Sequence, residues 1–380
     1  MPINYNHIPS PCYVLDEALL RRNLQLINRV QQEAGVKVIL AFKGFAMWAA
    51  FSLVNEYLSG ATASSLNEAR LCFEEMGTKA HTYAAAYLPQ EFEQILDYSS
   101  HIVFNSLNQY TQFKKQVKQH PEPISMGLRI NPGYSDVETE LYNAASPVSR
   151  LGVGPELLVD GLPSEIEGLH FHVLCESDSY ALEKVLEKME ERFGHLLPQV
   201  KWVNMGGGHL MTRTDYDLDH LIKTLKAFKE KHQVDIIMEP GSAIAWQTGD
   251  LLATVLDVVV NGGVKTAILD VSFTCHMPDT LEMPYKPEVV GAQSGPVDGQ
   301  HQYRLGGTSC LAGDFLTEYS FEGELKPGDQ LILKDMMHYT MVKTTTFNGV
   351  AHPSIGIWKE NGEFQLVRNF GYEDYKGRLS

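Results

Sequence analysis

The chain has 380 residues, with 31 lysines and arginines against 47 aspartates and glutamates, and its formal net charge is −16. Apolar residues make up 44 % of the chain and charged residues 21 %, a composition that can fill a hydrophobic core and that excludes a disordered protein. The negative charge argues against nucleic acid and anionic membranes as partners, because like charges repel. It is compatible with a cationic small molecule, although an acidic surface alone is the simpler explanation.

Cysteine usage and the chain's amino terminus indicate a cytoplasmic protein. The five cysteines are Cys12, Cys72, Cys175, Cys275 and Cys310. Their odd number and the lack of CxxC spacing favour reduced thiols over a disulfide framework or a structural zinc site. The first residues do not show the basic region followed by an apolar region that is typical of a signal peptide. The longest apolar run, Leu251 to Val260, is interrupted by Asp257 and is too short to span a membrane.

Short apolar runs alternate with amphipathic helical stretches up to about residue 245. The runs are Val38–Phe42, Gly60–Ser64, Ala80–Ala85, His101–Asn105, Ile124–Ile130, Ile166–Val173, Trp202–Met205 and Asp235–Glu239. Helical spacing of apolar residues follows in segments such as 66–76, 182–193 and 218–232. Alternation of this kind predicts parallel strands joined by helices, and eight runs predict an α/β fold with a (β/α)8 barrel over residues 14–245.

A second pattern follows residue 241. Strand-like runs separated by turns such as Asn261-Gly-Gly predict an antiparallel β-sandwich or β-barrel domain over residues 1–13 and 246–380. The expected strands are Cys12–Leu15, Ala253–Val260, Thr266–Val271, Tyr303–Leu305, Gln330–Leu333 and His338–Phe347. Residues 291–301 have the composition of a loose loop.

Reactive groups in a (β/α)8 barrel lie just past the carboxyl ends of the strands. Lys43 follows the first run, and a lysine in an apolar strand is costly unless its amine is paired or has become an imine. The ordinary alternative is a lysine whose ammonium reaches water. His170 and His172 lie on one face at the end of the sixth run. With Cys175 they could begin a zinc site, but the remaining ligands are not found at metal spacing, which leaves packed histidines or a ring stacked on a flat cofactor.

Candidate functional residues also lie at two further strand ends. Asn204-Met-Gly-Gly-Gly-His209 begins at the end of the seventh run, and glycines there let backbone N–H groups approach a phosphate. Glu239 ends the eighth run and needs a cationic or protonated partner, either Arg129 or a pyridinium N–H. An imine-forming lysine, a stacking histidine, a phosphate cradle and a carboxylate for a ring nitrogen together match pyridoxal phosphate.

At these residues the chain resembles the alanine-racemase-type (fold type III) pyridoxal-phosphate decarboxylases, a family that includes ornithine, arginine and diaminopimelate decarboxylases. The likeness extends from about Pro11 to Gly349. It implies that Lys43 forms the Schiff base with pyridoxal 5'-phosphate and that His172, also counted as catalytic, stacks on its ring. The expected remaining cofactor contacts are Arg129, Gly206, Gly207, Gly208, Glu239, Gly241, Ser242 and Tyr339.

The same resemblance implies a homodimer with shared active sites. Gly307-Thr-Ser-Cys310 and Asp314 look like the motif whose cysteine and acid reach into the partner subunit's site, and Phe347-Asn-Gly349 looks like an interface motif. Cys310 is then the expected proton donor to the substrate carbon. Its alternative role is that of a small buried apolar residue.

Departures from the family pattern indicate one branch. The chain has His172-Val-Leu-Cys175 and Glu239-Pro-Gly-Ser242 where the family usually has a serine and an arginine that contact the phosphate. At these positions the chain resembles the carboxynorspermidine (carboxyspermidine) decarboxylases, which release CO2 to form a polyamine. For a small cationic polyamine-type substrate, the expected contacts are Glu176, Glu239, His276, Asp279, Glu282 and Asp314.

Other functions compete with this interpretation. A diaminopimelate decarboxylase would need arginines for a distal carboxylate, whereas the candidate positions here are acidic. An ornithine-type decarboxylase is a further alternative function. A racemase usually uses a tyrosine where this chain has Cys310. A noncatalytic homologue would typically have lost the lysine, the glycines or the cysteine, all of which are present. No metal is expected.

Overall fold

The computed structural model describes residues 2–283 and 285–380, which form two compact units. One unit, here called the barrel unit, comprises Asn23–Ile244. The other, the sheet unit, comprises the residues up to Arg22 together with those from Ala245 onward. Helix α1 (Glu17–Ala34) runs from the end of the first sheet-unit segment into the barrel unit.

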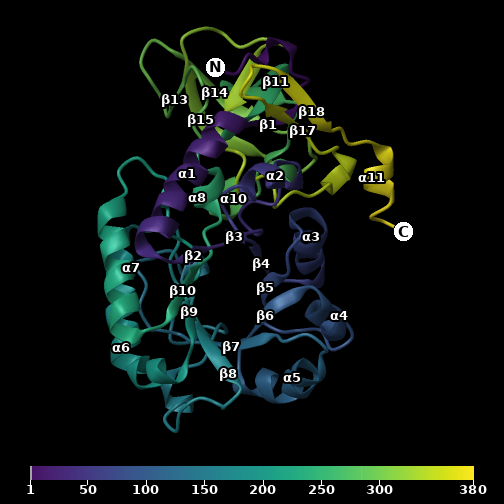
Figure 1. Cartoon of the computed structure of the whole chain (residues 1–380). Coiled ribbons are helices and arrows are strands. Elements are labelled where there is room, and N and C mark those ends of the chain that lie inside the picture. The colour runs from purple at the N-terminus through teal and green to yellow at the C-terminus, as the bar shows by residue number, and fades with distance from the viewer. Residues whose placement is uncertain (1, 284) are drawn as a thin grey trace. The chain divides into compact units, whose positions relative to one another are not determined.

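The barrel unit is built around nine parallel strands (Figure 1). They are β2 (Lys37–Val38), β3 (Leu40–Ala41), β4 (Ala61–Ala63), β5 (Ala80–Tyr83), β6 (Ser99–Phe104), β7 (Ser125–Arg129), β8 (Ile166–His170), β9 (Trp202–Asn204) and β10 (Asp235–Met238). The predicted first strand is divided at Ile39: β2 pairs with β10 and β3 pairs with β4. Because both halves belong to one extended segment, the sheet closes on itself, and the predicted α/β barrel is confirmed.

Helices connect these strands around the outside of the barrel (Figure 1). They are α2 (Phe51–Val54), α3 (Leu66–Met76), α4 (Phe92–Asp97), α5 (Leu107–Gln119), α6 (Ser179–Phe193) and α7 (Leu218–His232). The short helix α8 (Ser242–Ala245) follows β10, the last strand of the barrel. Short 3₁₀ turns occupy Trp48–Ala50, Glu140–Tyr142, Pro155–Leu157 and Gly194–Gln199.

Side-chain caps determine where the longer helices begin. The hydroxyl of Ser65 accepts a hydrogen bond from the Glu68 N–H at 3.2 Å, and that of Ser106 accepts one from the Gln109 N–H at 3.1 Å. Asp178 caps α6 in the same way. Each cap satisfies an amide that the first helical turn leaves unpaired, so these residues end the preceding loop and start the helix.

A tryptophan at the start of β9 fills the barrel interior near the amino ends of the strands. Trp202 packs with Ile39, Val103 and Ile237. Neighbouring strands make room for the indole with glycine: a Cβ added at Gly168 would lie 2.1 Å from the ring. The side chains of one interior layer are thus matched across strands that are far apart in sequence.

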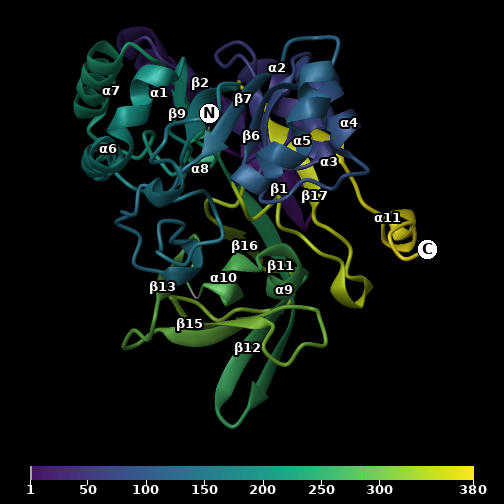
Figure 2. The ribbon, with the colours of Figure 1, turned by 90° about the horizontal axis from the view of Figure 1, so that it is seen from below.

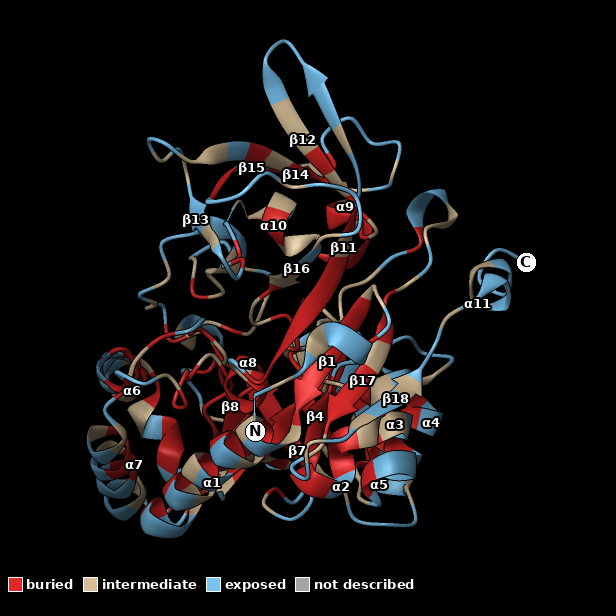
Figure 3. Cartoon of the chain, turned by 90° about the horizontal axis from the view of Figure 1, so that it is seen from above, coloured by how far each residue is buried: buried red, intermediate tan, exposed pale blue. Residues whose placement is uncertain are grey.

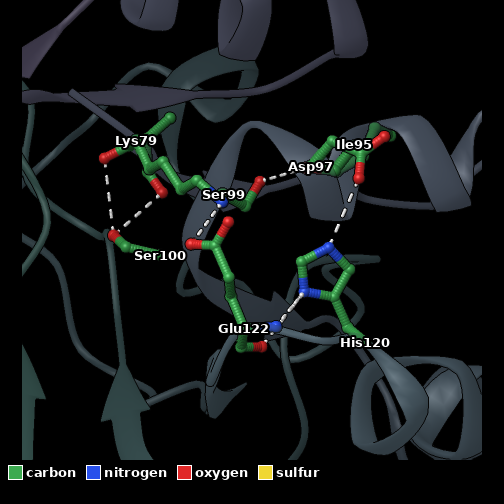
Figure 4. Close-up of polar contacts among 8 residues, drawn as sticks. Lys79, Ile95, Asp97, Ser99, Ser100, His120 and Glu122 are labelled. Atoms are coloured by element: carbon green, nitrogen blue, oxygen red, sulfur yellow. Dashed lines mark hydrogen bonds and ion pairs between the residues drawn. The ribbon is translucent and has the colours of Figure 1, made fainter. Parts of the chain in front are cut away.

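Polar contacts tie the loops at the amino ends of β6 and β7 (Figure 4). The Lys79 ammonium lies 2.9 Å from the Glu122 carboxylate, and the His120 ring lies 3.3 Å from Asp97. The Ser99 hydroxyl donates to the Ile95 carbonyl at 2.6 Å. These contacts hold the end of the barrel opposite to the one where reactive groups gather.

The sheet unit contains a second nine-stranded sheet, in the order β13-β15-β14-β12-β11-β1-β17-β18 with β16 paired to β11. Its strands are β1 (Cys12–Asp16), β11 (Gly249–Asn261), β12 (Val264–Leu269), β13 (Ala292–Ser294), β14 (His301–Gly306), β15 (Phe315–Phe321), β16 (Gln330–Leu333), β17 (Ser354–Trp358) and β18 (Phe364–Arg368). Its helices and 3₁₀ turns are Tyr5–His7, α9 (Phe273–His276), α10 (Asp279–Glu282), Phe347–Gly349 and α11 (Tyr372–Lys376).

Most pairings in this sheet are antiparallel, as expected, but β1–β17 and β12–β14 are parallel. The first half of β11 is buried, while its second half continues with β12 as an exposed hairpin (Figures 2 and 3). The strand predicted over His338–Phe347 is wrong. Turns and a bend occupy residues 338–343, and Tyr339 has a φ of +43°, which is incompatible with an extended strand.

We expect Gly168→Ala to destabilise the protein by about 2 kcal/mol or more, since the new methyl group would overlap the Trp202 ring. Urea unfolding followed by circular dichroism measures the loss. Gly194→Ala is the matched control, because a Cβ there meets no described atom within 4 Å and the backbone is helical. Equal loss of stability in both variants would contradict the packing argument.

Candidate active site

Lys43 lies directly after β3, in a turn that packs on the segment following β10. A Cβ on Gly44 would lie 2.6 Å from the Cα of Gly241, so the two backbones are in direct contact. The Ala41 N–H also donates to the Pro240 carbonyl at 3.1 Å. These contacts bring the turn that carries Lys43 next to the one that carries Glu239.

A backbone hydrogen bond fixes the tautomer of His172. The Gly207 N–H donates to Nδ1 of His172 at 2.8 Å, so Nδ1 is an acceptor and the ring proton of the neutral imidazole is on Nε2. Nε2 lies 3.0 Å from Nζ of Lys43. Since Nε2–H can only donate, Nζ must accept through a lone pair, and Lys43 is therefore a neutral amine in this contact.

The electrostatic environment agrees with a neutral pair. The side chain of Lys43 is accessible, but the surrounding protein removes enough water to lower its pKa, and the nearby Arg129 cation acts in the same direction. Glu239 opposes this shift. Burial, with Lys43 and Arg129, also holds the pKa of His172 well below its ordinary value. A neutral amine is the form of lysine that attacks a carbonyl carbon.

The triple glycine passes close to two other strand ends. A Cβ on Gly207 would lie 2.2 Å from the Glu239 carbonyl oxygen, and one on Gly208 would lie 2.0 Å from the Leu174 carbonyl oxygen. Gly208 also has a φ of +87°. Any side chain would therefore displace the loop from β8 and β10, which makes this loop a backbone-only surface suited to a phosphate.

Glu239 is buried and held by two neighbours. Nδ2 of Asn204 donates to its Oε1 at 2.5 Å, and Nε2 of His170 lies 3.6 Å from its Oε2. Burial by itself would raise the pKa of Glu239, but His170, Asn204 and Thr62 outweigh it and leave the pKa lowered. A charged carboxylate of this kind suits a protonated ring nitrogen.

Arg129, the last residue of β7, is buried and holds His172 rather than Glu239. Its Nη2 donates to the His172 carbonyl at 2.9 Å, and its guanidinium lies 4.6 Å from the centre of the Tyr83 ring. Arg129 was expected either to pair with Glu239 or to lie beside the cofactor. Its contacts with His172 and Tyr83 favour the second role.

Gly241, Ser242 and Glu176 are the remaining predicted site residues of the barrel unit. Gly241 packs on Gly44, and Ser242 is the buried first residue of α8. Glu176 is exposed, with a φ of +53°, and its backbone carbonyl accepts from Nη1 of Arg213 at 3.2 Å.

In the sheet unit, the carboxylate of Asp314 accepts three hydrogen bonds from nearby backbone and side-chain groups. Oδ2 accepts from the Ser272 hydroxyl at 2.8 Å and the Ser309 N–H at 3.1 Å, and Oδ1 accepts from the Thr274 N–H at 3.0 Å. Asp314 therefore organises the loop before Cys310. Cys310 itself is exposed, and its N–H donates to Oδ1 of Asn348 at 2.7 Å.

The predicted acids on α10 already bind an ammonium group. Nζ of Lys343 donates to Oδ1 of Asp279 and, at 2.5 Å, to Oε2 of Glu282. Burial would lower the pKa of Lys343, but these two carboxylates raise it to about 12. The lysine is thus a firm cation held by two acids.

His276 and Tyr339 occupy different settings in the sheet unit. His276 is buried, and its Nδ1 accepts from the Ser272 N–H at 3.1 Å, which places the ring proton on Nε2. Burial lowers the pKa of His276 to about 4. Tyr339 lies in the turn after β16, with its ring 6.2 Å from that of His338.

Two residues of the site were missed as functional candidates. Asn204 begins the glycine motif, and its position at a strand end was the available signal. His170 was noted only for sharing a face with His172. Their contacts with Glu239 depend on β8, β9 and β10 being neighbours, which short sequence patterns do not reveal.

A family model described as "Pyridoxal-dependent decarboxylase, C-terminal sheet domain" matches residues 12–337. The chain belongs to the pyridoxal-dependent decarboxylases. It is therefore an enzyme whose cofactor is pyridoxal phosphate, as the resemblance implied.

Two decarboxylases are similar to this chain over almost its whole length. The chain is 54 % identical over 373 residues to carboxyaminopropylagmatine decarboxylase of Synechocystis sp., covering 98 % of this chain and 96 % of that protein. It is 43 % identical over 384 residues to carboxynorspermidine/carboxyspermidine decarboxylase of Campylobacter jejuni, covering 98 % and 99 %.

Solved structures share the fold. The crystal structure of Campylobacter jejuni carboxynorspermidine decarboxylase, complexed with norspermidine, superposes with a TM-score of 0.90 at 42 % identity, covering 98 % of this chain and all of that one. Helicobacter pylori diaminopimelate decarboxylase has a TM-score of 0.80 at 17 % identity, covering 99 % and 98 %, which supports the fold alone.

The residues present fit pyridoxal phosphate. Lys43 offers a neutral amine, the glycine loop has no room for side chains, and buried Glu239 carries a negative charge beside an imidazole that has no hydrogen-bond partner among the described residues. Among residues 2–283 and 285–380, no cluster of three or more His, Cys, Asp or Glu side chains could hold a metal ion. No helix in this part of the chain is long and apolar enough to cross a membrane.

We expect borohydride reduction of the holoenzyme to attach the cofactor covalently to Lys43, and Lys43→Ala to abolish this attachment. Because the pKa of Lys43 is lowered, labelling of the apoenzyme by pyridoxal phosphate should rise with pH with a midpoint below the ordinary lysine value of about 10.4. Intact-mass spectrometry and peptide mapping provide the measurement.

Lys37→Ala is the matched control for this labelling. Lys37 also has a pKa lowered by burial, but it lies on β2 near the amino end of the barrel strands, 3.5 Å from His81. Labelling that persists in Lys43→Ala, or that is lost in Lys37→Ala, would contradict the assignment.

Proposed function

We propose that the chain decarboxylates carboxynorspermidine, and carboxyspermidine as well, to norspermidine and spermidine in polyamine biosynthesis. The observation that supports a cationic substrate is the pair Asp279 and Glu282, which binds a primary ammonium group, that of Lys343. The names of the similar Campylobacter proteins support the same substrate class.

The reaction breaks one carbon–carbon bond and needs one proton. The bond between the α-carbon and the carboxylate breaks, CO2 leaves, and the electron pair that remains is neutralised by a proton on the α-carbon. Bound pyridoxal phosphate supplies the electron sink. Lys43 holds the cofactor through its amine, and Glu239 keeps positive charge on the ring nitrogen.

The other barrel-unit residues orient these groups. His172 stacks on the ring, and its own ring is fixed by Gly207 and by Arg129 at its backbone. Gly206, Gly207 and Gly208 bind the phosphate, with Gly241, Ser242 and Tyr339 as further contacts. Ser242 stands where the family usually has an arginine that contacts the phosphate.

We also propose that the enzyme is a homodimer in which Cys310 of one subunit donates the proton in the partner's site. Asp314 orders the loop that carries Cys310, through Ser309 and Gly307. The proposed contacts of the cationic substrate are His276, Asp279, Glu282, Glu176 and Glu239. All five cysteines are free thiols, which supports a cytoplasmic location.

Carboxyaminopropylagmatine is the second candidate substrate, favoured by the 54 % identity to the Synechocystis enzyme. It ends in a guanidinium group where carboxynorspermidine ends in an ammonium group. A planar guanidinium can bind one carboxylate through two hydrogen bonds, whereas an ammonium is a compact charge. The acidic pair on α10 suits either group.

A substrate panel tests the proposed function. CO2 release by the holoenzyme is measured with carboxynorspermidine, carboxyspermidine, carboxyaminopropylagmatine, meso-diaminopimelate and L-ornithine. We expect the largest kcat/KM with a carboxyaminopropyl polyamine, and the ratio between the amine and guanidine substrates decides between the two candidates. Turnover confined to diaminopimelate or ornithine would contradict the proposal.

Variants of the acidic pair connect this panel to the structure. Asp279→Asn should raise KM for carboxynorspermidine by about tenfold or more, since a charged hydrogen bond is lost. Lys343→Met should lower KM, because an internal ammonium no longer competes for the two carboxylates. Lys265→Met, which removes an exposed pair with Glu324, is the control and should leave KM unchanged. A higher KM in Lys343→Met would mean that the lysine supports the site instead.

Subunit mixing tests the shared site. Lys43→Ala and Cys310→Ala are each expected to be nearly inactive alone, with the cofactor retained in Cys310→Ala. Random reassociation of equal amounts should restore about a quarter of wild-type activity, because half of the dimers are mixed and each mixed dimer has one intact site. Activity that stays at the level of the parent variants would contradict a shared site.

A further inference from the structure

His170 is a buried imidazole that the chain leaves without a hydrogen bond. It is the last residue of β8 and is 2 % exposed. Neither ring nitrogen has a hydrogen-bond partner among the described residues. A buried polar group in this state is costly, so its retention at a strand end requires a physical reason.

The geometry directs this ring toward Glu239. His170 is in register with Arg129 on one side and with Asn204 on the other. Its Nε2 lies 3.6 Å from Oε2 of Glu239, just beyond hydrogen-bond distance. Since Asn204 already donates to Oε1, the imidazole is the neighbour of the second oxygen.

The surroundings keep the ring neutral. Burial lowers the pKa of His170, and the Arg129 cation acts in the same direction, while Glu239 opposes them. Tyr83 covers another side, with its ring 5.2 Å away, and His81 and His172 are further imidazoles in electrostatic range. A neutral imidazole has one N–H to donate, and Glu239 is the acceptor that it faces.

A metal site with His172 does not account for His170. Nδ1 of His172 accepts the Gly207 N–H, and Nε2 faces Lys43. Neither nitrogen of His172 is therefore available to a metal shared with His170 or Cys175.

We propose that His170 is a positioning residue for the cofactor's ring nitrogen: its Nε2–H donates to Oε2 of Glu239 and keeps that carboxylate charged and oriented. This inference rests on the proposed role of Glu239. Two donors, from Asn204 and His170, then stabilise the buried negative charge. Without the second donor, Glu239 becomes the better base and takes the proton that the ring nitrogen needs.

The test reads the ring nitrogen directly. Holoenzymes reconstituted with pyridoxal phosphate labelled with ¹⁵N in the ring are compared by NMR for wild type, His170→Phe, His170→Gln and His170→Asn. The amide nitrogen of Gln can approximate Nε2, whereas that of Asn is nearer to Nδ1. We expect a protonated ring-nitrogen shift in wild type and in His170→Gln, and a deprotonated one in His170→Phe and His170→Asn.

Kinetics with the best substrate of the panel provide the second measurement. In His170→Phe we expect kcat to fall about tenfold or more, with KM changed by less than about twofold, and His170→Gln to recover most of kcat. His81→Phe, which replaces another buried imidazole, controls for general disturbance of the barrel and should keep the protonated shift.

Glu239→Gln separates this proposal from the proposed function. A protonated ring nitrogen that persists in Glu239→Gln would overturn the role of Glu239 itself. A deprotonated shift in Glu239→Gln together with a wild-type shift in both His170→Phe and His170→Asn would overturn the role of His170 alone. If His170→Phe does not fold, the Gln and Asn pair decides: the same shift in both would contradict the proposal.

Discussion

The hydrogen bond from the Gly207 N–H to Nδ1 of His172 is the contact on which the rest of the site depends. It places the imidazole proton on Nε2, and Nε2 can then contact Lys43 only if the lysine is a neutral amine. One backbone amide thus sets both the orientation of the His172 ring and the protonation of Lys43. Because Gly207 has no side chain, its loop can lie against Glu239 and His172 together.

Close backbone contacts between strand ends provide the precision that this arrangement needs. Gly44 against Gly241 and Gly208 against Leu174 bring turns from β3, β8, β9 and β10 to within van der Waals distance. Trp202 and Gly168 match one another deeper in the barrel. The reactive groups therefore rest on a rigid framework, which limits how far Lys43, His172 and Glu239 can move relative to one another.

Charged residues of the sheet unit show that residue type alone does not describe a binding group. Asp314 binds Ser272, Thr274 and Ser309, so its carboxylate supports a loop. Asp279 and Glu282 hold Lys343, and any substrate cation that binds them must compete with that lysine. An internal ammonium of this kind keeps two neighbouring carboxylates compatible with folding and also marks the charge that they prefer.

The sequence by itself determined the alternation of strands and helices, the α/β barrel, the pyridoxal-phosphate family and the identity of the residues at the strand ends, because periodicity and short motifs are local properties. It did not determine the division of the first strand at Ile39, the turns over 338–343, or the contacts of Asn204 and His170 with Glu239. Those depend on which strands are neighbours and on which donors reach a given oxygen. Protonation states were likewise decided only by the tertiary structure, because a tautomer follows from its hydrogen-bond partners and a pKa from burial and nearby charge.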